Sequence, residues 1–360
     1  MMKNAPKATP MVRPDAGSWG GLFRVAVVGA GSLKGREIKE VLTERNFPSH
    51  DVRLLDDDES LGQLDAIGDE PTFIQSVLPE HMENVDFTFF AADEKFTRKT
   101  WNMAKKAGSD IIDLSFGLEG EQGVELRAPW IERELGSVPR LDLVAGPVRV
   151  AHSASMVLAL LLLRANKVAK VKNSIVTVLE PASERGKRGM DELHEQTINL
   201  LSFQQMPKNV FDAQVAFNVL DRYGANATSS LATVEKQILG DFKRIVNDRA
   251  EVPSLMLLQA PIFHGHGFSL YIELERPAQH EEVAAALSGD HVAIWHDEED
   301  APSNVNAAGQ EQIQAVVRAD SERDNGFWIW AVSDNLRIAA VAAVECAESL
   351  IPGRPRGTVQ

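Results

Sequence analysis

A glycine-rich loop near the start of the chain is the first segment whose residues could do chemistry. Gly29–Gly35 reads GAGSLKG and lies between an apolar run, Phe23–Val28, and a helical pattern. Glycines in such a strand–loop–helix unit let backbone N–H groups approach a pyrophosphate at the helix N-terminus. The spacing is not the usual dinucleotide fingerprint, so a turn that only packs strand on helix remains the alternative. The residues predicted to bind a dinucleotide are Gly29, Gly31, Ser32 and Gly35.

An acidic cluster, Asp56–Glu59, follows the second strand candidate at about the distance expected for ribose recognition. A carboxylate such as that of Asp56 accepts a hydrogen bond from a ribose 2′-hydroxyl and repels a 2′-phosphate. The cluster therefore predicts NAD rather than NADP as the cofactor. A solvated acidic turn is the alternative interpretation.

Two histidines, His264 and His266, are two residues apart in the segment APIFHGH. On one strand they would lie on the same face, so a two-histidine metal pair is geometrically possible. No third ligand is evident, and structural or catalytic zinc sites need at least three protein ligands. We therefore favour a single histidine satisfied by its surroundings and predict no metal site.

Charged and nucleophilic side chains occur at three further places. Glu180, Glu184 and Arg185 form either a new polar site or a solvated loop, and we favour the loop. Ser153 carries a hydroxyl, which needs a base to act as a nucleophile. Cys346, the single cysteine of the 360-residue chain, lies on the apolar face of a helical pattern, so we expect it to be buried and inert.

The composition limits the classes of function. A net charge of -15, from 37 basic and 52 acidic residues, argues against non-specific binding to nucleic acid or to an anionic membrane. The longest strongly apolar run, Met156–Leu163, is too short to span a bilayer. Residues 1–20 contain no continuous apolar segment, so we expect a loose arm rather than a secretory signal. A single cysteine excludes an intrachain disulfide and fits a cytoplasmic protein.

Short apolar runs alternate with helical patterns in the first 150 residues, which predicts a parallel sheet with crossover helices. Helical spacing of apolar residues covers Arg36–Arg45, and a second helix is expected over Thr97–Ala107. We expect residues 21–150 to form a Rossmann-type dinucleotide-binding domain. The strand candidates are Phe23–Val28, Asp51–Leu55, Val85–Ala91, Ser109–Leu114 and Leu141–Ala145.

The pattern changes after residue 150, where longer strand candidates alternate apolar and polar residues as half-buried antiparallel strands do. Ser153–Ala165 is a nearly all-apolar helix, which predicts burial, and Asp191–Leu201 is a second helix. We expect a second α/β domain over residues 151–333, a helix over 334–351 with Asp334 as its N-cap, and a loose tail over 352–360. The strand candidates are Ser174–Leu179, Ser254–Ala260, Phe268–Glu275, Ile313–Arg318 and Gly326–Val332.

Several segments, taken with the glycine loop, resemble the aspartate-semialdehyde dehydrogenase family in their order and spacing. The resemblance runs from about Phe23 to Ile351. Two segments, ASERGKRGMDEL and LQAPIFHGHG, are similar to a paralogue group of that family that lacks the catalytic cysteine. The other matching segments are ERNFPSHDVRLL, QVAFNVL, APIFHGH and SDNLRIAA.

The resemblance implies a Rossmann-type domain that binds NAD or NADP, a mixed α/β domain for catalysis and dimerisation, and a final helix that returns to the first domain. It also implies a chemistry. A cysteine thiolate attacks an aldehyde, hydride leaves to the nicotinamide, and phosphate resolves the acyl-enzyme thioester. A histidine acts as acid and base, a glutamine orients the intermediate, and arginines bind the substrate carboxylate and the phosphate.

The resemblance also assigns roles to single positions. The family's histidine falls on His266, and its orienting glutamine falls on Glu180. The nucleophilic cysteine falls on Ala151 by local alignment, or on Ser153 if the spacing to the next strand is kept. The chain therefore carries no thiol at either position.

The binding positions of the family also differ in this chain. Its two anion-binding arginines fall on Gln259 and near Glu119, and neither residue is positively charged. The asparagine that meets the nicotinamide falls on Asn335, and the acidic substrate-binding residue falls on or beside Glu235. Lys34 occupies a place in the glycine loop where a small apolar residue is usual.

The positions that differ from the family all serve the thiol-dependent dehydrogenase reaction. Thiolate chemistry needs a low-pKa sulfur, and an arginine fork is what recognises carboxylate and phosphate. Because the nucleophile, the orienting group and both arginines are absent together, we predict a nucleotide-binding or partner-binding protein that lacks the thiol-dependent dehydrogenase reaction.

Two other functions remain open. One is an enzyme of altered chemistry that uses His266, Glu180 or Ser153 on a neutral substrate. The other is an NAD(P)-dependent oxidoreductase that acts on a semialdehyde in amino-acid biosynthesis, with the role of its cysteine assigned wrongly here.

We also expect a homodimer built on the second domain, as the resemblance implies. The strands Phe268–Glu275 and Gly326–Val332 alternate in polarity, and the segment FWIWAV, Phe327–Val332, is unusually apolar. Two tryptophans in so short a segment either fill a core or anchor an interface.

Overall fold

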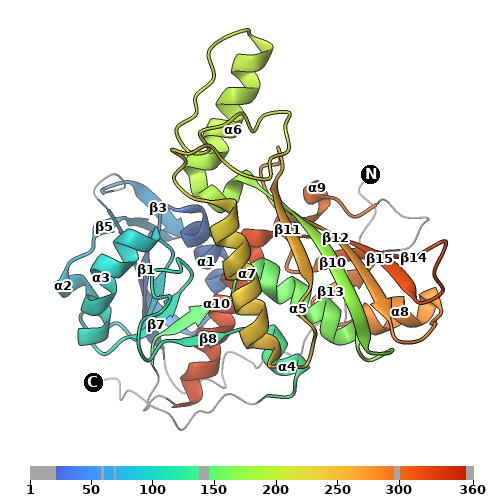
Figure 1. Cartoon of the computed structure of the whole chain (residues 1–360). Coiled ribbons are helices and arrows are strands. Elements are labelled where there is room, and N and C mark those ends of the chain that lie inside the picture. Colours follow the sequence, from blue (N-terminus) through green and yellow to red (C-terminus); the bar gives the residue numbers. More distant parts are fainter. Residues whose placement is uncertain (1–21, 58–60, 69, 138–145, 296–300, 354–360) are drawn as a thin grey trace, which may run out of the picture. The chain divides into compact units, whose positions relative to one another are not determined.

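The computed structural model describes residues 22–57, 61–68, 70–137, 146–295 and 301–353, and these residues form two compact units (Figure 1). The N-terminal unit contains the described residues up to Ala151 and those from Ala339 onward. The central unit is His152–Ile338. The expected arm over residues 1–20 and the end of the expected tail lie outside the described residues. None of the described helices is long and apolar enough to cross a membrane.

The N-terminal unit is built on a seven-stranded sheet with the order β5-β2-β1-β6-β7-β9-β8, and its paired strands are parallel. The predicted parallel sheet is therefore confirmed. The predicted strand Leu141–Ala145 lies outside the described residues, and three short strands of this sheet, β5, β8 and β9, were not predicted. The strands are β1 (Phe23–Val28), β2 (Ser49–Asp56), β5 (Gln75–Ser76), β6 (Phe87–Phe90), β7 (Asp110–Asp113), β8 (Glu125–Arg127) and β9 (Val148–Val150).

Helix α1 begins one turn earlier than its apolar spacing indicates. It runs over Leu33–Glu44, because the Ser32 side chain accepts a hydrogen bond from the Gly35 N–H and caps the helix. This cap brings the N-terminus of α1 directly behind the glycine loop. The remaining elements of the unit are α2 (Pro79–Met82), α3 (Glu94–Lys106), α4 (Pro129–Glu134) and a small hairpin of β3 (Leu64–Ile67) and β4 (Glu70–Phe73).

The central unit is built on a six-stranded mixed sheet with the order β11-β10-β12-β15-β14-β13. The pairs β10–β11 and β13–β14 are parallel, and the other described pairs are antiparallel. The expectation of antiparallel strands is therefore correct for the middle of the sheet and wrong at its two edges. The strands are β10 (Val171–Glu180), β11 (Ser254–Gln259), β12 (His266–Leu274), β13 (Val292–Ile294), β14 (Ile313–Ala319) and β15 (Gly326–Ser333).

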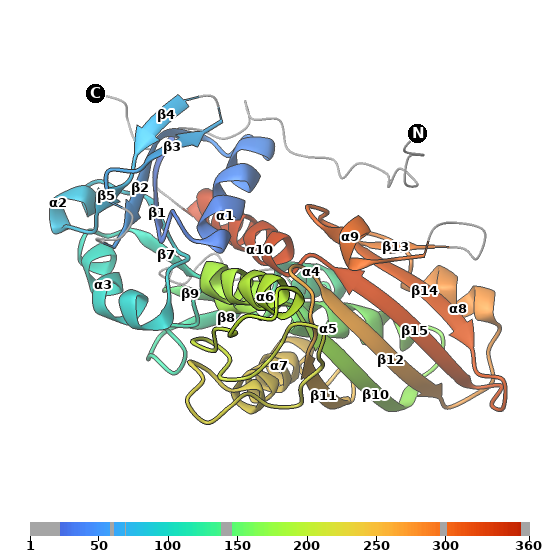
Figure 2. The same cartoon turned by 90° about the horizontal axis from the view of Figure 1, so that it is seen from above.

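Helix α5 (Ser153–Ala165) is buried along its whole length, as its composition predicts. It contacts α7 (Leu231–Val246) and α8 (His280–Leu287), which pack on β11 and β14 respectively (Figure 2). Helix α7 was not predicted, although its buried residues Leu231, Ile238 and Phe242 recur at helical spacing. The short helix α9 (Asn304–Ala307) and the longer α6 (Gly186–Leu201) complete the unit.

Helix α10 (Asn335–Leu350) begins in the central unit and continues in the N-terminal unit from Ala339. Asp334 caps it, as predicted, by accepting hydrogen bonds from the N–H groups of Leu336 and Arg337. Cys346 lies in this helix and is fully buried, and burial raises the pKa of its thiol. The expectation of a buried cysteine is confirmed.

Candidate functional site

The glycine loop of the N-terminal unit has two positions that tolerate no side chain. Gly29 has φ +85°, and a Cβ there would lie 2.3 Å from the backbone nitrogen of Ala92. A Cβ on Gly35 would lie 2.2 Å from the carbonyl oxygen of Gly29. The loop needs both glycines for its own packing, so the packing interpretation explains them without a ligand. The same packing places the N-terminus of α1 at the carboxyl ends of the parallel strands, where such folds bind dinucleotides.

Asp56 lies at the end of β2 and points to this loop. Its two carboxylate oxygens accept hydrogen bonds from the N–H groups of Gly31, at 2.8 Å, and Asp57, at 2.9 Å. The side chain is buried rather than part of a solvated turn. Its position at the end of β2, beside the glycine loop, is where a carboxylate accepts from the ribose of a dinucleotide, so Asp56 fits the predicted cofactor. Residues 58 and 59 of the acidic cluster lie outside the described residues.

Ser32 and Lys34 extend from the loop to the neighbouring strands. The Ser32 hydroxyl donates to the carbonyl of Ala91 at 2.9 Å, and the Lys34 ammonium donates to the carbonyl of Leu114 at 3.0 Å. The same ammonium lies 5.0 Å from the ring centroid of Phe116. Lys34 is therefore anchored at the end of β7, and the loop with Asp56 fits the sugar-phosphate part of a dinucleotide.

A row of polar side chains crosses the central sheet at the ends of four strands. In the strand register, Glu180 is opposite Gln259, and His266 is opposite Ser333. The last pair between β10 and β12 is Leu179 with Gly267, so the next residues, Glu180 and His266, are neighbours as well. Residues opposite one another share a face of the sheet, with Cβ atoms about 5 Å apart. All four row residues are 0% exposed. The row is Gln259, Glu180, His266 and Ser333, and we call it the polar row.

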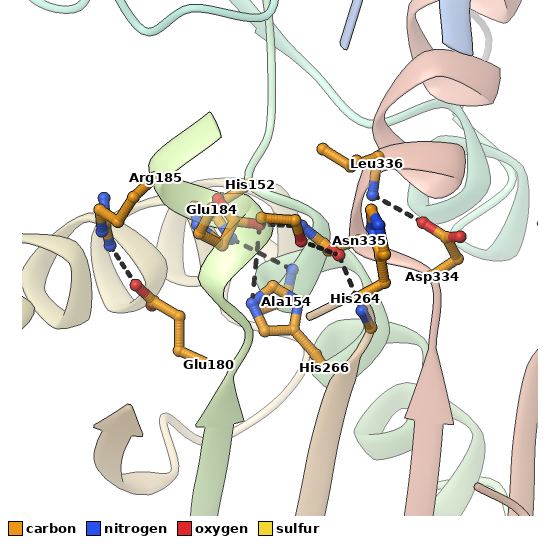
Figure 3. A network of polar contacts seen from close by, with 12 residues as sticks. His152, Ala154, Glu180, Glu184, Arg185, His264, His266, Asp334, Asn335 and Leu336 are labelled. Carbon is orange, nitrogen blue, oxygen red and sulfur yellow. Dashed lines mark hydrogen bonds and ion pairs between the residues drawn. The ribbon is translucent and has the colours of Figure 1, made fainter. Parts of the chain in front are cut away.

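Glu180 pairs with Arg185 inside this buried region (Figure 3). The turn Ala182–Arg185 brings the guanidinium back to the Glu180 carboxylate, and the guanidinium also lies 5.8 Å from the ring centroid of Tyr223. Burial raises the pKa of Glu180 to about 7, against the opposing charge of Arg185. The favoured interpretation of these residues as a solvated loop is wrong, because β10 ends inside the core and carries Glu180 with it.

Both the nitrogen and the oxygen of the Gln259 side-chain amide form hydrogen bonds. Its nitrogen donates to the carbonyls of Glu180 and Ala260, and its oxygen accepts from the Tyr223 hydroxyl at 2.6 Å. The position where the resemblance places an anion-binding arginine therefore carries a neutral amide whose hydrogen bonds are used within the protein.

His266 begins β12, and Glu184 approaches it. The distance from its Nε2 atom to a carboxylate oxygen of Glu184 is 3.7 Å. Asn335 donates to that oxygen at 2.8 Å and accepts from the Ser183 hydroxyl and the Gly265 N–H. Burial lowers the pKa of His266, although Glu184 opposes this effect. The ring is therefore neutral at physiological pH and has a carboxylate that Asn335 holds in place.

The start of α5 brings a second histidine to this site. His152 is the N-cap, its Nδ1 accepts from the Ala154 N–H at 3.2 Å, and its ring centroid lies 5.8 Å from that of His266. Ala151 and Ser153 flank it and are both buried. The sequence offered a signal for His152, since it directly precedes an apolar helix, but the predicted site did not include it.

Three other residues considered in the sequence analysis are not part of the polar row. His264 precedes β12, in a bend followed by Gly265 at φ +81°, so the assumption that both histidines share a strand is wrong. The described residues contain no group of three side chains that could hold a metal ion. Glu235 lies on α7 and accepts from the Leu257 N–H at 3.1 Å. Glu119 is exposed in the loop after β7.

The two units match two family descriptions. Residues 24–136 match the NAD-binding domain of semialdehyde dehydrogenases, and residues 161–338 match their dimerisation domain. A USG-1 protein homolog from Pseudomonas aeruginosa is 31% identical over 332 residues, which are 91% of this chain and 98% of that protein. An aspartate-semialdehyde dehydrogenase from Rickettsia bellii is 27% identical, with the same coverage of the two chains.

Solved structures agree with these matches over most of the chain. A probable aspartate-semialdehyde dehydrogenase from Pseudomonas aeruginosa has a TM-score of 0.79 at 28% identity, covering 92% of this chain and 98% of that one. Aspartate semialdehyde dehydrogenase II from Vibrio cholerae, in complex with ASA, has a TM-score of 0.78 at 26% identity and the same coverage. Because both the sequence and the fold match over nine-tenths of its length, this chain belongs to the aspartate-semialdehyde dehydrogenase family.

Proposed function

We propose that this protein binds a nicotinamide dinucleotide but does not carry out the thiol-dependent dehydrogenase reaction. One observation carries the proposal: the start of α5, beside His266, presents Ala151, His152 and Ser153 and no thiol. The single cysteine of the chain, Cys346, is fully buried in α10, and burial raises the pKa of its thiol. A thiol in that state is a poor nucleophile.

The charges near His266 support the same proposal. In proteins, a guanidinium whose N–H groups face the ligand is well suited to bind a substrate carboxylate or phosphate. In the central unit, the Arg185 guanidinium is paired with Glu180. The position where the resemblance predicts an arginine carries the neutral amide of Gln259. An anionic substrate would therefore meet carboxylates rather than an arginine fork.

The cofactor is proposed to be NAD in preference to NADP. The pyrophosphate would lie against the glycine loop at the N-terminus of α1, and Asp56 would accept from the adenosine ribose. A bound dinucleotide supplies a hydride acceptor or donor. The Asp56 carboxylate supports the preference for NAD, because it would repel a 2′-phosphate at the same position.

A homodimer through the central unit is also proposed. Ile175, Tyr271 and Trp328 are opposite one another across β10, β12 and β15, on the face away from the buried core residues. Ile175 is 58% exposed and Trp328 is 46% exposed. Large apolar side chains that cluster on one exposed face are typical of an interface. A two-fold dimer would match this face with itself.

Two measurements on the purified protein test the proposed function together. Calorimetry with NAD is expected to show saturable binding, because the loop and Asp56 are independent of the missing thiol. Reduction of NAD or NADP with aspartate semialdehyde and phosphate is expected to remain at the level of a protein-free control. Robust turnover would overturn the proposal, and the lack of any dinucleotide binding would refute its cofactor part.

A second candidate function is supported by the Glu184–His266 contact. A neutral histidine with a carboxylate at 3.7 Å is a possible proton acceptor for a substrate that needs no covalent intermediate. Turnover of a neutral substrate that depends on His266 and is unaffected by thiol-blocking reagents would favour this function over simple binding.

A further inference from the structure

Three of the four side chains in the polar row have polar atoms without a hydrogen-bond partner among the described residues. Gln259 uses its whole amide in hydrogen bonds within the protein. Beyond it, the described residues offer no hydrogen-bond partner to Oε2 of Glu180, to either ring nitrogen of His266 or to the hydroxyl of Ser333. These four atoms belong to three side chains that follow one another across β10, β12 and β15.

Such a concentration of unpaired polar atoms is uncommon in a protein interior. The great majority of buried polar side-chain atoms have a partner, because leaving them unpaired disfavours the folded state. Here the residues that carry the unpaired atoms are neighbours in the strand register, at the ends of their strands and beside the N-cap of α5. The arrangement fits a group that bonds to several of them at once.

The charges around the row decide which group that is. Arg185 is committed to Oε1 of Glu180, which leaves Oε2 as an acceptor. His266 is neutral at physiological pH, and the carboxylates of Glu184 and Asp334 both act on it. Glu180 within the row and Glu184 and Asp334 beside it are therefore three acidic groups, and the guanidinium of Arg185 opposes them. A positive ligand group is attracted by this field and a negative one is repelled.

We propose that the polar row recognises a small ligand through a protonated amino group, and that Glu180 selects an amine against a carboxylate. The ammonium donates to Oε2 of Glu180 and to an acceptor of His266 or Ser333. The inference rests on the proposed function, because the thiol-dependent reaction would bring phosphate and a substrate carboxylate to the same place. It specifies the class of ligand that such a site would bind instead.

The experiment compares two small probes of opposite charge with three carbon atoms each, propylammonium chloride and sodium propionate, at equal ionic strength. Binding to the full chain is measured by calorimetry in slightly alkaline buffer, where Glu180 is ionised. We expect saturable binding of propylammonium and no binding of propionate. Equal binding of both probes, a preference for propionate, or binding of neither overturns the proposal.

Glu180→Gln tests the selecting residue. It removes the carboxylate and releases the Arg185 guanidinium, so propylammonium binding should be lost and propionate binding should appear. Glu281→Gln, at an 84% exposed side chain on α8, is the control and should behave as the wild type. An unchanged preference in Glu180→Gln refutes the assigned role.

A second variant keeps the test decisive if Glu180→Gln does not fold. Glu184→Gln leaves the Glu180–Arg185 pair intact and should weaken propylammonium binding by about fivefold or more, because one nearby negative charge is lost. An unchanged affinity counts against the proposal. Because no dinucleotide is present in these titrations, their failure would leave the proposed lack of thiol chemistry standing, whereas turnover with aspartate semialdehyde would contradict that proposal directly.

Discussion

At the scale of single residues, the site near His266 differs from the expected one mainly in charge. Glu180 and Arg185 neutralise each other in the interior, and Gln259 is a hydrogen-bonded amide. A single returned thiol would therefore face a site without a free arginine fork. We expect Ala151→Cys and Ser153→Cys, made separately, to leave aspartate semialdehyde oxidation at background. Recovery of turnover in either variant, measured by nicotinamide reduction, would show that the anion-binding residues matter less than the structure indicates.

His266 should make stability depend on pH. Burial lowers the pKa of the folded histidine below the ordinary 6.5. As the pH falls below about 6.5, the unfolded chain takes up a proton that the folded chain does not. The contribution of His266 to the free energy of unfolding should therefore decrease with falling pH, by up to about 1.4 kcal/mol per pH unit, and Glu180, whose folded pKa is raised to about 7, opposes it over the same range. Denaturant titrations at several pH values measure this slope.

His266→Gln should lower the slope of the free energy of unfolding against pH, because glutamine has no proton to gain and the opposing effect of Glu180 remains. His194→Gln, at an exposed position on α6, is the matched control and should keep the wild-type slope. Equal slopes in all three proteins would show that His266 is not the residue that titrates.

Asp56 should set the choice between cofactors. A 2′-phosphate beside its carboxylate would lose on the order of 1 kcal/mol, so NAD should bind about fivefold more tightly than NADP. Asp56→Asn removes the charge and should bring the two affinities together. Tighter binding of NADP by the wild-type protein in calorimetry would refute the role of Asp56.

At the scale of elements, two helical glycines give opposite expectations. Gly35 in α1 and Gly240 in α7 both have ordinary helical backbones, but a Cβ at Gly35 meets the Gly29 carbonyl at 2.2 Å while Gly240 has open space. Gly35→Ala should destabilise the protein by about 1–3 kcal/mol, the usual cost of overpacking. Gly240→Ala should be neutral or stabilising by up to about 1 kcal/mol. Thermal midpoints that move in the same direction would contradict the packing of the loop.

The sequence was a good guide to elements whose pattern is local. Phe23–Val28 and Ser153–Ala165 coincide with β1 and α5, because an apolar run ends at a loop or a cap in each case. Helix α7 was missed even though its apolar residues have helical spacing. Strand β9, at Val148–Val150, has three residues, which is too short for a periodic signal.

The candidate site was harder to predict, because it depends on register. Glu180, His266 and Ser333 are far apart in the sequence and meet only when three strands pair in one alignment. The Glu180–Arg185 pair depends on the turn Ala182–Arg185, and no periodic pattern of apolar residues predicts that turn. The charged composition of the segment Glu180–Arg185 favours a solvated loop. The structure shows instead that β10 ends inside the core, so that Glu180 is buried.

At the scale of the whole molecule, the account predicts a dimer. The central sheet exposes the apolar side chains of Trp328 and Ile175 on one face. We expect the same face of a second copy to pack against it and bury them. Light scattering at micromolar concentration should give twice the chain mass of 39.5 kDa. Trp328→Glu places a charge on that face and should shift the protein toward the monomer, whereas a wild-type mass near 39.5 kDa would rule the dimer out under those conditions.

The central claim is that no covalent acyl intermediate forms on this protein. The most direct measurement is the intact mass of the protein after incubation with aspartate semialdehyde and NAD or NADP, without phosphate, so that an acyl-enzyme would persist. The account predicts an unchanged mass, because Ala151 and the buried Cys346 offer no nucleophile and Ser153 offers a hydroxyl rather than a thiol. A cofactor-dependent mass increase, located by peptide mapping to Ser153 or Cys346, would contradict it.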